Sequence, residues 1–242
     1  MIDNVTLASA TLAALTDETE AGGVGTLGEK YVHKILKYAT EPDPRHHEVS
    51  VCGCIADVYN EDGVTEIQTR SFERLVPKLG RLLPTERVCV VCPMPYEVRL
   101  CRIDPESGEI TARKSPRRRG IYDAAIELYK LREFIPHGHL TVCILLLAVD
   151  EYRGAPNRRG RSARINSSPT SVVASYTLRE AQDYSILLPP QLPDEFVASE
   201  YYRYIHSRTR YSCYALKLCE YLGLVSKIGK RGRAVLYRRE KC

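Results

Sequence analysis

The sequence lacks the features that would place it in a membrane, in a secretory route or in a fibrous structure. Its N-terminal stretch, MIDNVTLASATLAALTDETE, has no basic region and no sustained apolar core, so we expect no signal peptide. The longest apolar run, Leu140 to Val149, is too short to span a bilayer and predicts a buried strand. No internal repeat or coiled-coil heptad is evident.

The modest charge and the cysteine content exclude two further classes of protein. Charged residues make up 27% of the chain and apolar residues 44%, which favours a folded, soluble protein over a disordered one. Nine cysteines without a secretory signal favour a reducing cytosol over a disulfide framework. Cys52-x-Cys54 and Cys89-x-x-Cys92 fall in apolar strand segments, which favours buried thiols over a zinc site. We therefore expect a cytoplasmic protein.

Positive charge is concentrated at the C-terminal end. Residues 201–242 contain eleven Lys or Arg and two Glu, a net charge of +9, whereas the whole chain carries +5. The remaining 200 residues therefore carry −4 by difference. A basic end on a mildly acidic body is typical of a protein with a polyanionic partner, although a solvated basic tail has the same composition.

Hydrophobic periodicity predicts an alternation of helices and strands. A helix is expected over 27–39, followed by three short strands between His47 and Thr69. A second helix begins at Ser71, a candidate N-cap, and Pro77 should bend it or shift its start. The later elements are the buried strand ERVCVVCPMP, a hairpin around Pro105 to Gly108, the helix IYDAAIELYKLREFI and the buried strand LTVCILLLAVD. This order predicts an α/β fold with a mixed sheet flanked by helices.

Two carboxylates and an amide fall close together in the three-strand segment. Glu66 and Gln68 are two residues apart and therefore project from the same face of a strand. A turn at Glu61-Asp62-Gly63 would fold Asp57, in the preceding strand, back beside them. Converging carboxylates repel each other unless a cation lies between them, and oxygen ligands suit Mg²⁺ or Mn²⁺. The pattern predicts a divalent-metal site; the alternative is a solvated strand edge.

This arrangement resembles the PD-(D/E)xK nuclease superfamily, in which an Asp, a short hairpin and Glu-x-Lys on the next strand form the core. The resemblance covers roughly residues 25 to 150 and rests on Asp57, Glu66-Ile67-Gln68 and, in the preceding predicted helix, Glu29. The chain has Ala56 where Pro is common, and Gln68 where the superfamily usually has Lys. The resemblance implies a restriction endonuclease-like α/β/α sandwich with a mixed sheet. The phrases EIQTRSF and RKSP are also similar to an uncharacterised family of bacterial proteins.

The nuclease resemblance also implies metal-assisted hydrolysis of phosphodiester bonds. Asp57, Glu66 and the backbone carbonyl of Ile67 would hold Mg²⁺ or Mn²⁺, which would polarise the phosphate and activate water. Gln68 would orient that water or a phosphate oxygen, and Glu29 would bind through water or orient the site. Three further residues could add a ligand or a proton shuttle, or be ordinary surface polar groups: His33, His47 and Glu48.

Basic segments supply candidate contacts to nucleic acid. The run from Arg113 to Arg119 and the segment from Arg153 to Arg164 could together clamp a phosphate backbone, or lie in solvated loops. Residues 191–242 have the pattern helix, helix and basic β-hairpin, which describes a winged helix-turn-helix. The predicted nucleic-acid contacts are Arg117, Arg118, Arg119, Arg208, Arg210, Lys217, Lys230, Arg231 and Arg233.

The sequence thus predicts four segments and one leading function. The segments are a weakly ordered stretch over 1–24, a nuclease-like domain over 25–152, a basic linker with a connecting helix over 153–190, and a winged-helix domain over 191–242. The leading function is a Mg²⁺-dependent endonuclease acting on double-stranded DNA. The alternatives are a non-catalytic nucleic-acid-binding or regulatory protein on a degenerate nuclease fold, and a protein-interaction adaptor. Cleavage of both DNA strands would favour a homodimer, although no motif specifies one.

Overall fold

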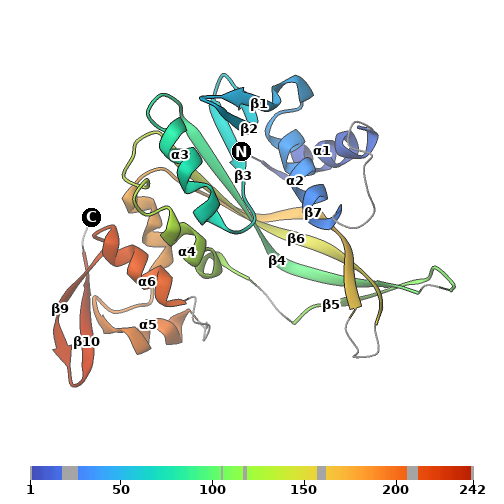
Figure 1. Cartoon of the computed structure of the whole chain (residues 1–242). Helices are drawn as coiled ribbons and strands as arrows, with labels where there is room; N and C mark the ends of the chain where they lie inside the picture. Colours follow the sequence, from blue (N-terminus) through green and yellow to red (C-terminus); the bar gives the residue numbers. More distant parts are fainter. Residues whose placement is uncertain are drawn as a thin grey trace. The chain divides into compact units, whose positions relative to one another are not determined.

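The computed structural model describes residues 2–17, 27–104, 106–116, 119–156, 162–205 and 212–240, without the side chains of 27–30, 156 and 212 (Figure 1). The chain divides into two compact units. Unit 1 consists of Met1–Ile67, Pro93–Arg119 and Leu145–Ser175, and unit 2 of Gln68–Cys92, Gly120–Ile144 and Tyr176–Cys242.

A mixed sheet organises most of the strands, so the expected α/β class is confirmed. Its order is β1-β2-β3-β4-β6-β7, and β5 pairs with β4 outside this path. The hairpins β1–β2, β2–β3 and β4–β5 are antiparallel. The Val88 N–H donates to the His139 carbonyl and the Arg99 guanidinium donates to the Asp150 carboxylate; both contacts join residues 51 apart, so β4 and β6 run parallel. The strand bounds are β1 His47–Val51, β2 Cys54–Asn60, β3 Gly63–Ile67, β4 Val88–Ile103, β5 Ile110–Lys114, β6 Leu140–Pro156 and β7 Ser162–Leu178.

Two tight turns shape the first three strands of unit 1. Cys52 and Gly53 form the two-residue connection between β1 and β2, and both have positive φ, 49° and 70°. This is the backbone that a twisted two-residue hairpin requires, and glycine adopts it without strain. Glu61 and Asp62 form the second turn, as the sequence predicted, where Asn60 pairs with Gly63. The turns bring β1, β2 and β3 side by side (Figure 1).

Helix α2 (Leu27–Thr40) agrees with the helix predicted over 27–39, and it covers this part of the sheet. Its apolar side includes Ile35 and Leu36, which are fully buried, while Ala56 and Val58 of β2 are fully buried as well. The preceding stretch, expected to be weakly ordered, contains helix α1 (Asn4–Thr16), which packs on α2. Asp3 caps α1, because its carboxylate accepts a hydrogen bond of 2.8 Å from the Thr6 N–H.

The segment expected to be a basic linker is largely strand. Strand β6 continues to Pro156, and β7 begins at Ser162. The composition there is rich in Arg, Gly and Ser, but pairing in a sheet supplies the backbone hydrogen bonds that the side chains do not predict. The residues between these strands, 157–161, lie outside the described part of the chain.

Unit 2 contains the helices that follow the three-strand segment. The element predicted to begin at Ser71 starts with the 3-10 turn η3 (Phe72–Arg74) and continues as helix α3 (Val76–Leu82). Ser71 has a φ of 59° and makes no capping hydrogen bond through its side chain, so that prediction was wrong. Pro77 lies in the first turn of α3, where a missing N–H costs nothing, and so it shifts the helix start rather than bending the helix.

Helix α4 (Ile121–Lys130) confirms the predicted amphipathic helix, and it packs against α6 (Ser212–Tyr221). The rings of Tyr129 and Tyr214 meet edge to face with centroids 5.4 Å apart. The guanidinium of Arg132 lies 4.6 Å from the Tyr129 ring centroid. One side of α6 is therefore occupied by α4.

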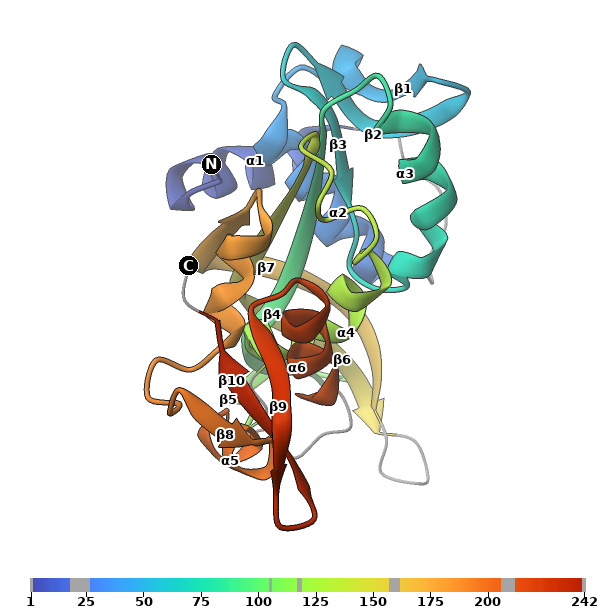
Figure 2. The same ribbon diagram turned by 90° about the vertical axis from the view of Figure 1, so that its left-hand side faces the viewer.

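The C-terminal part of unit 2 has a second, three-stranded sheet in the order β8-β10-β9. The predicted helix near residue 195 begins as strand β8 (Glu195–Val197) before helix α5 (Ala198–Tyr204). The predicted hairpin is formed by β9 (Val225–Arg231) and β10 (Ala234–Arg239), and the 3-10 helix η4 (Ala181–Leu187) precedes β8. In Figures 1 and 2 the tip of this hairpin projects beyond α5 and α6.

None of the helices in the described residues has the length and apolar character needed to cross a membrane.

Candidate active site

Asp57 and Glu66 converge where β2 and β3 lie side by side. The paired register joins Val58 to Thr65, so the next pair along the ladder is Asp57 and Glu66. The Ile67 N–H donates to Asp57 Oδ2 at 2.7 Å, and the Asp57 N–H donates to Glu66 Oε1 at 3.3 Å. Each carboxylate therefore accepts a hydrogen bond from the backbone of the opposite strand. The structure brings these two predicted residues together, and Ile67 joins them through its N–H.

Helix α2 contributes two side chains, one turn apart, to the same place. The Nε2 atom of His33 lies 3.1 Å from Asp57 Oδ2. The ammonium of Lys37 donates to Glu48 Oε1, on β1, at 2.8 Å. Residues four apart on a helix share a face, which explains why both side chains reach the strands. We call His33, Lys37, Glu48, Asp57 and Glu66 the carboxylate cluster.

Two members of the carboxylate cluster are nearly inaccessible to water. Glu66 is only 3% exposed and Lys37 only 5%. Lys37 lowers the pKa of Glu48 by hydrogen bonding and by its positive charge, while the negative charge of Asp57 works in the opposite direction. The charges of Lys37 and Asp57 thus both act on the pKa of Glu48. A buried lysine among carboxylates is stabilised only if their charges offset its desolvation.

Glu48 occupies an unusual backbone position. Its φ is 53°, in the left-handed region that residues other than glycine adopt uncommonly. Its side chain is 58% exposed at the same time as its carboxylate holds the buried Lys37 ammonium. Such strain persists only where the surrounding structure imposes it, and it is concentrated at functional sites.

Of the other two predicted catalytic residues, only Gln68 has a side chain in the described part of the structure. The Gln68 side-chain amide donates to the Arg70 carbonyl at 2.5 Å, a local bond in the loop that follows β3. Glu29 lies on α2, one turn before His33, but its side chain lies outside the described part of the structure. The predicted role of either residue stays a prediction.

Lys37 is the member of the cluster that sequence reasoning missed. Glu29, His33 and Lys37 are spaced four residues apart, so the three positions form one stripe along α2. That spacing was visible in the sequence. The packing of the stripe against β1 and β2, which gives it significance, was not.

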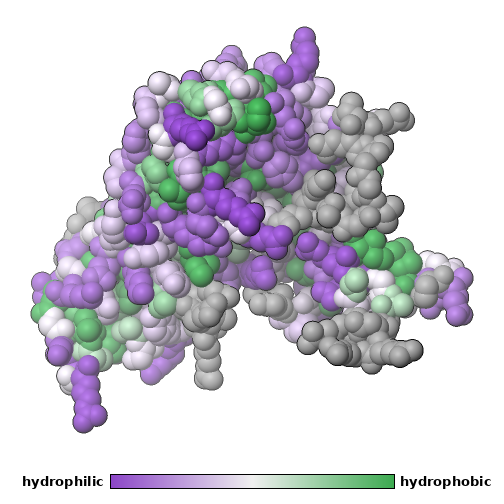
Figure 3. All heavy atoms as spheres, viewed as in Figure 1, coloured by the Kyte–Doolittle hydropathy of each residue, from purple (hydrophilic) through white to green (hydrophobic). Residues whose placement is uncertain are grey.

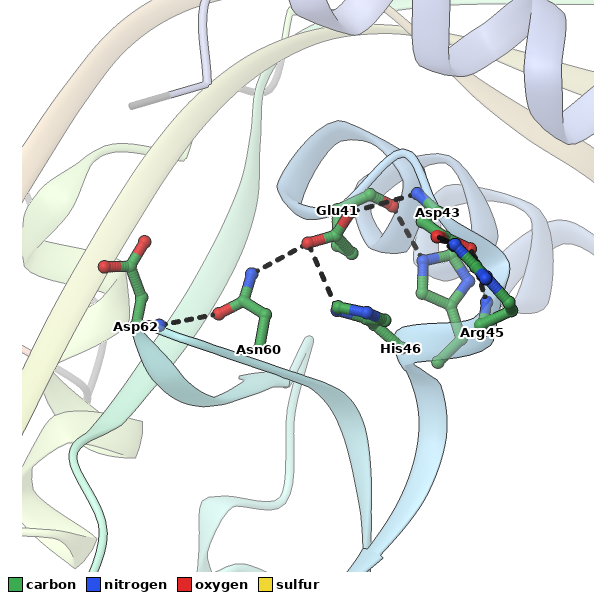
Figure 4. A network of polar contacts seen from close by, with 7 residues as sticks. Glu41, Asp43, Arg45, His46, Asn60 and Asp62 are labelled. Atoms are coloured by element: carbon green, nitrogen blue, oxygen red, sulfur yellow. Dashed lines mark hydrogen bonds and ion pairs between the residues drawn. The ribbon is translucent and has the colours of Figure 1, made fainter.

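A polar network fixes the chain on either side of the cluster (Figure 4). Glu41, just after α2, accepts a hydrogen bond of 2.9 Å from the Asn60 amide at the end of β2. Asn60 in turn accepts one of 3.0 Å from the Asp62 N–H in the next turn. The Asn60 bond is the main cause of the lowered pKa of Glu41, and His46 lies 3.7 Å from the same carboxylate. The network ties the end of α2 to the β2–β3 turn, and so limits how far the two can separate.

The residues present fit a hard divalent cation only in part. Asp57 and Glu66 supply two carboxylates, the ligand type that Mg²⁺ and Mn²⁺ prefer. Within the described residues, however, no group of three His, Cys, Asp or Glu side chains is arranged to hold a metal ion. The side chain of Glu29 and water would have to complete such a site.

The predicted nucleic-acid contacts fall into two groups. Arg117, Arg118, Arg208 and Arg210 lie outside the described residues. The others are exposed: Arg119 before α4, Lys217 on α6, and Lys230, Arg231 and Arg233 around the tip of the β9–β10 hairpin. The Lys217 ammonium lies 5.3 Å from the Tyr214 ring centroid, close to the side of α6 that packs on α4.

The basic hairpin is partly neutralised by acidic neighbours. Arg231 pairs with Glu200 of α5 at 3.1 Å, and Arg238 pairs with Glu195 of β8 at 2.9 Å. Among the residues that the structure describes, neither Lys230 nor Arg233 forms an ion pair. Hydrophilic side chains cover the hairpin tip at the lower left of Figure 3.

In the strand segment ERVCVVCPMP, Cys92 is buried and Cys89 is partly buried. Burial raises the pKa of Cys89 and of Cys92 to about 12 in each case. A metal ligand is a thiolate, so burial of this kind opposes zinc binding at these two positions.

A family model for a domain of unknown function, DUF8091, matches residues 30–179, more than half of the chain. The chain belongs to the DUF8091 family. A protein of Treponema pallidum (strain Nichols), described as "Uncharacterized protein", is 29% identical over 224 residues, which is 90% of this chain and 88% of the relative. No solved structure matches the chain. The expected similarity to an uncharacterised bacterial family is confirmed. The matched residues include α2 from residue 30, the carboxylate cluster and all of strands β1 to β7.

Proposed function

We propose that this DUF8091 protein is a Mg²⁺- or Mn²⁺-dependent endonuclease that hydrolyses phosphodiester bonds in double-stranded DNA. The observation that carries the proposal is the convergence of Asp57 and Glu66, each held by the opposite strand, next to His33 and Lys37 of α2. The element order α2-β1-β2-β3-α3-β4 is also that of the nuclease superfamily that the sequence resembles.

Each member of the cluster has a defined role in this proposal. Asp57 and Glu66 would bind the metal ion, which supplies Lewis acidity and an activated water. Glu29 or water, and the Ile67 carbonyl, would complete its ligands. His33, in contact with Asp57, orients that carboxylate and can exchange a proton with it.

Lys37 offers the positive charge that the chain lacks at position 68. Fixed cations aimed at the charge that develops during phosphoryl transfer are a major source of rate enhancement. A lysine that is 5% exposed is held in place by its surroundings and does not have to be ordered during the reaction. Gln68 would orient the attacking water or a phosphate oxygen.

The C-terminal part of unit 2 would dock the DNA as a winged helix. In support, the order is η4, β8, α5, α6, β9 and β10, with β10 between β8 and β9, which is the arrangement of a helix-turn-helix followed by a wing. Lys230 and Arg233 at the exposed hairpin tip would then contact phosphates. Because α4 covers one side of α6, the hairpin rather than α6 is the proposed main contact.

The test is cleavage of supercoiled plasmid, single-stranded DNA and RNA with Mg²⁺ or Mn²⁺, comparing the wild type with Asp57→Ala and Glu66→Ala. The proposal expects the wild type to cut plasmid and both variants to be inactive. Equal Mn²⁺ affinity of wild type and both variants would show that the assigned site is wrong.

A second candidate function is non-catalytic DNA binding on a degenerate nuclease fold. The observation that favours it is Gln68, whose side chain bonds locally to Arg70 and carries no charge. This function expects salt-dependent DNA binding without cleavage in any divalent metal. Gln68→Lys is then the follow-up variant, because it would restore the missing charge. If the native protein has no affinity for DNA at all, the result would favour the third hypothesis, a protein-interaction adaptor.

A further inference from the structure

The arm formed by β4 and β5, with the adjoining ends of β6 and β7, contains a groove, and Arg113 and Arg153 in its lining come from the two basic segments that the sequence singled out. Its volume is about 520 Å³, and all of its lining belongs to unit 1. Three of the eight lining residues are arginines, namely Arg102, Arg113 and Arg153. None of the eight is acidic or aromatic. The other five lining residues are Leu100, Cys101, Thr111, Ala112 and Ser162. We call this the arginine groove.

The hairpin register explains how the arginines come together. Arg102 pairs with Thr111 and Leu100 with Arg113, so Arg102 and Arg113 are diagonal neighbours across β4 and β5. Residues two apart on a strand share a face, so both side chains leave the hairpin on the same side. Arg153 reaches the groove from β6, where its guanidinium donates to the Ser162 carbonyl at 3.4 Å.

The charge of the groove is largely uncompensated. Among the described residues, Arg102 and Arg113 form no ion pair, whereas Arg153 is bound by Glu151, with Nε 2.6 Å from Oε1. A neighbouring hollow of about 420 Å³ shares Arg113 but is balanced, because its Arg99 and Lys114 pair with Asp150 and Glu97. Like charges on neighbouring strands repel each other. The repulsion between Arg102 and Arg113 raises the free energy of the groove, and a bound anion would offset it.

We propose that the arginine groove binds the sugar–phosphate backbone of duplex DNA, an inference that rests on the proposed nuclease function and assigns its substrate-binding surface. The guanidinium group is planar and binds phosphate oxygens in pairs. Single-stranded nucleic acid is usually held by stacking of bases on aromatic rings, and none of the described residues that line the groove is aromatic. The groove therefore matches a backbone whose bases are paired.

The test is the affinity of the full-length protein for a fluorescent DNA duplex, measured by anisotropy in EDTA over a series of salt concentrations. Removing two phosphate contacts with Arg102→Ala/Arg113→Ala should weaken binding about tenfold or more and make the slope of log K against log[salt] shallower by about 2. Both arginines are exposed, so the variant should fold normally. Arg45→Ala/Arg74→Ala removes two other exposed arginines outside the groove lining and should leave the slope unchanged.

Arg102→Lys/Arg113→Lys gives a second comparison, because it keeps the charge and should keep the salt slope. Wild-type affinity and slope in the alanine variant would overturn the groove, as would tighter binding of single-stranded DNA, RNA or polyglutamate than of duplex. Mn²⁺ binding and plasmid cleavage by the same variants separate this result from the proposed function. If Asp57→Ala leaves Mn²⁺ binding unchanged while the groove variant loses DNA, the nuclease fails and the groove stands; the reverse result rejects the groove alone.

Discussion

The carboxylate cluster and the β9–β10 hairpin both concentrate charge, but in opposite ways. In the cluster, two nearly buried charges of opposite sign, Glu66 and Lys37, are held among hydrogen-bonded partners on four different elements. On the hairpin, Lys230 and Arg233 are exposed, and neither forms an ion pair among the described residues. In the cluster, hydrogen bonds hold the charged side chains in place. On the hairpin, Lys230 and Arg233 extend into solvent with no ion pair among the described residues to hold them.

This difference separates chemistry from attraction. Catalytic groups have to be held in a productive geometry, and buried hydrogen-bonded side chains meet that need. Phosphate contacts require charge more than geometry, because the free energy of counterion release depends mainly on the number of charges. Substitutions in the cluster should therefore change rate steeply, and substitutions on the hairpin should change affinity gradually.

The largest effect is expected from Asp57→Asn. This change keeps the shape of the side chain and an oxygen that can accept the Ile67 N–H, but it removes the negative charge. If the metal ion stabilises the transition state by several kcal/mol, its loss should lower cleavage by about 10³-fold or more. Plasmid cleavage and Mn²⁺ calorimetry measure the two effects. Glu106→Asn, at an exposed position of the β4–β5 turn, is the control. An active Asp57→Asn enzyme would contradict the assignment of Asp57 as a metal ligand.

Lys37→Met should give the next largest effect. Methionine has nearly the length of lysine but no charge, so the helix can still pack on the strands. Loss of a fixed cation should reduce kcat by about 10²-fold. Mn²⁺ affinity should stay the same or rise, because a positive charge near the carboxylates has been removed. The opposite signs of the two readouts distinguish Lys37 from Asp57. Unchanged cleavage would reduce Lys37 to a structural partner of Glu48.

Some parts of the cluster and of the fold were easier to predict from the sequence than others. Asp57 and Glu66 could be paired in advance, because strand alternation and a short turn determine which side chains meet. Lys37 could not, since its place in the cluster depends on how α2 packs on β1 and β2. Strand β7 was missed for a related reason: the Ser-rich first half of its sequence has weak strand propensity, and pairing with β6 determines its conformation. Helix α1 was missed although Asp3 is a good N-cap, because its exposed Val5 and Leu12 give it no clear apolar face.

The hairpin prediction compares cations that form ion pairs with cations that form none, within the same β9–β10 hairpin. Lys230→Ala/Arg233→Ala should weaken duplex binding by about tenfold and make the salt slope shallower by roughly 2, because both charges are available to phosphates. Arg231→Ala/Arg238→Ala removes the same charge, but Glu200 and Glu195 already offset these arginines. Its effect on affinity should be smaller. Anisotropy titrations at several salt concentrations measure both, and equal effects would mean that the ion pairs open on binding.

The smallest effect concerns the acid stability of the cluster. Lys37 lowers the pKa of Glu48 in the folded protein, so this contact stabilises the fold above the pKa of an unfolded glutamate, about 4.3, and the stabilisation is lost as the pH falls through the lower folded value. Because the Glu48 side chain is 58% exposed, solvent screens the pair, and such pairs contribute about 0–1 kcal/mol. Glu48→Gln should therefore lower Tm by at most about 4 °C at pH 7, and this difference from the wild type should shrink as the pH falls below about 4. Glu106→Gln, at an exposed position, should match the wild type throughout this pH range. A Tm difference for Glu48→Gln that does not shrink as the pH falls would mean that the strained backbone at Glu48, rather than its charge, is what the substitution disturbs.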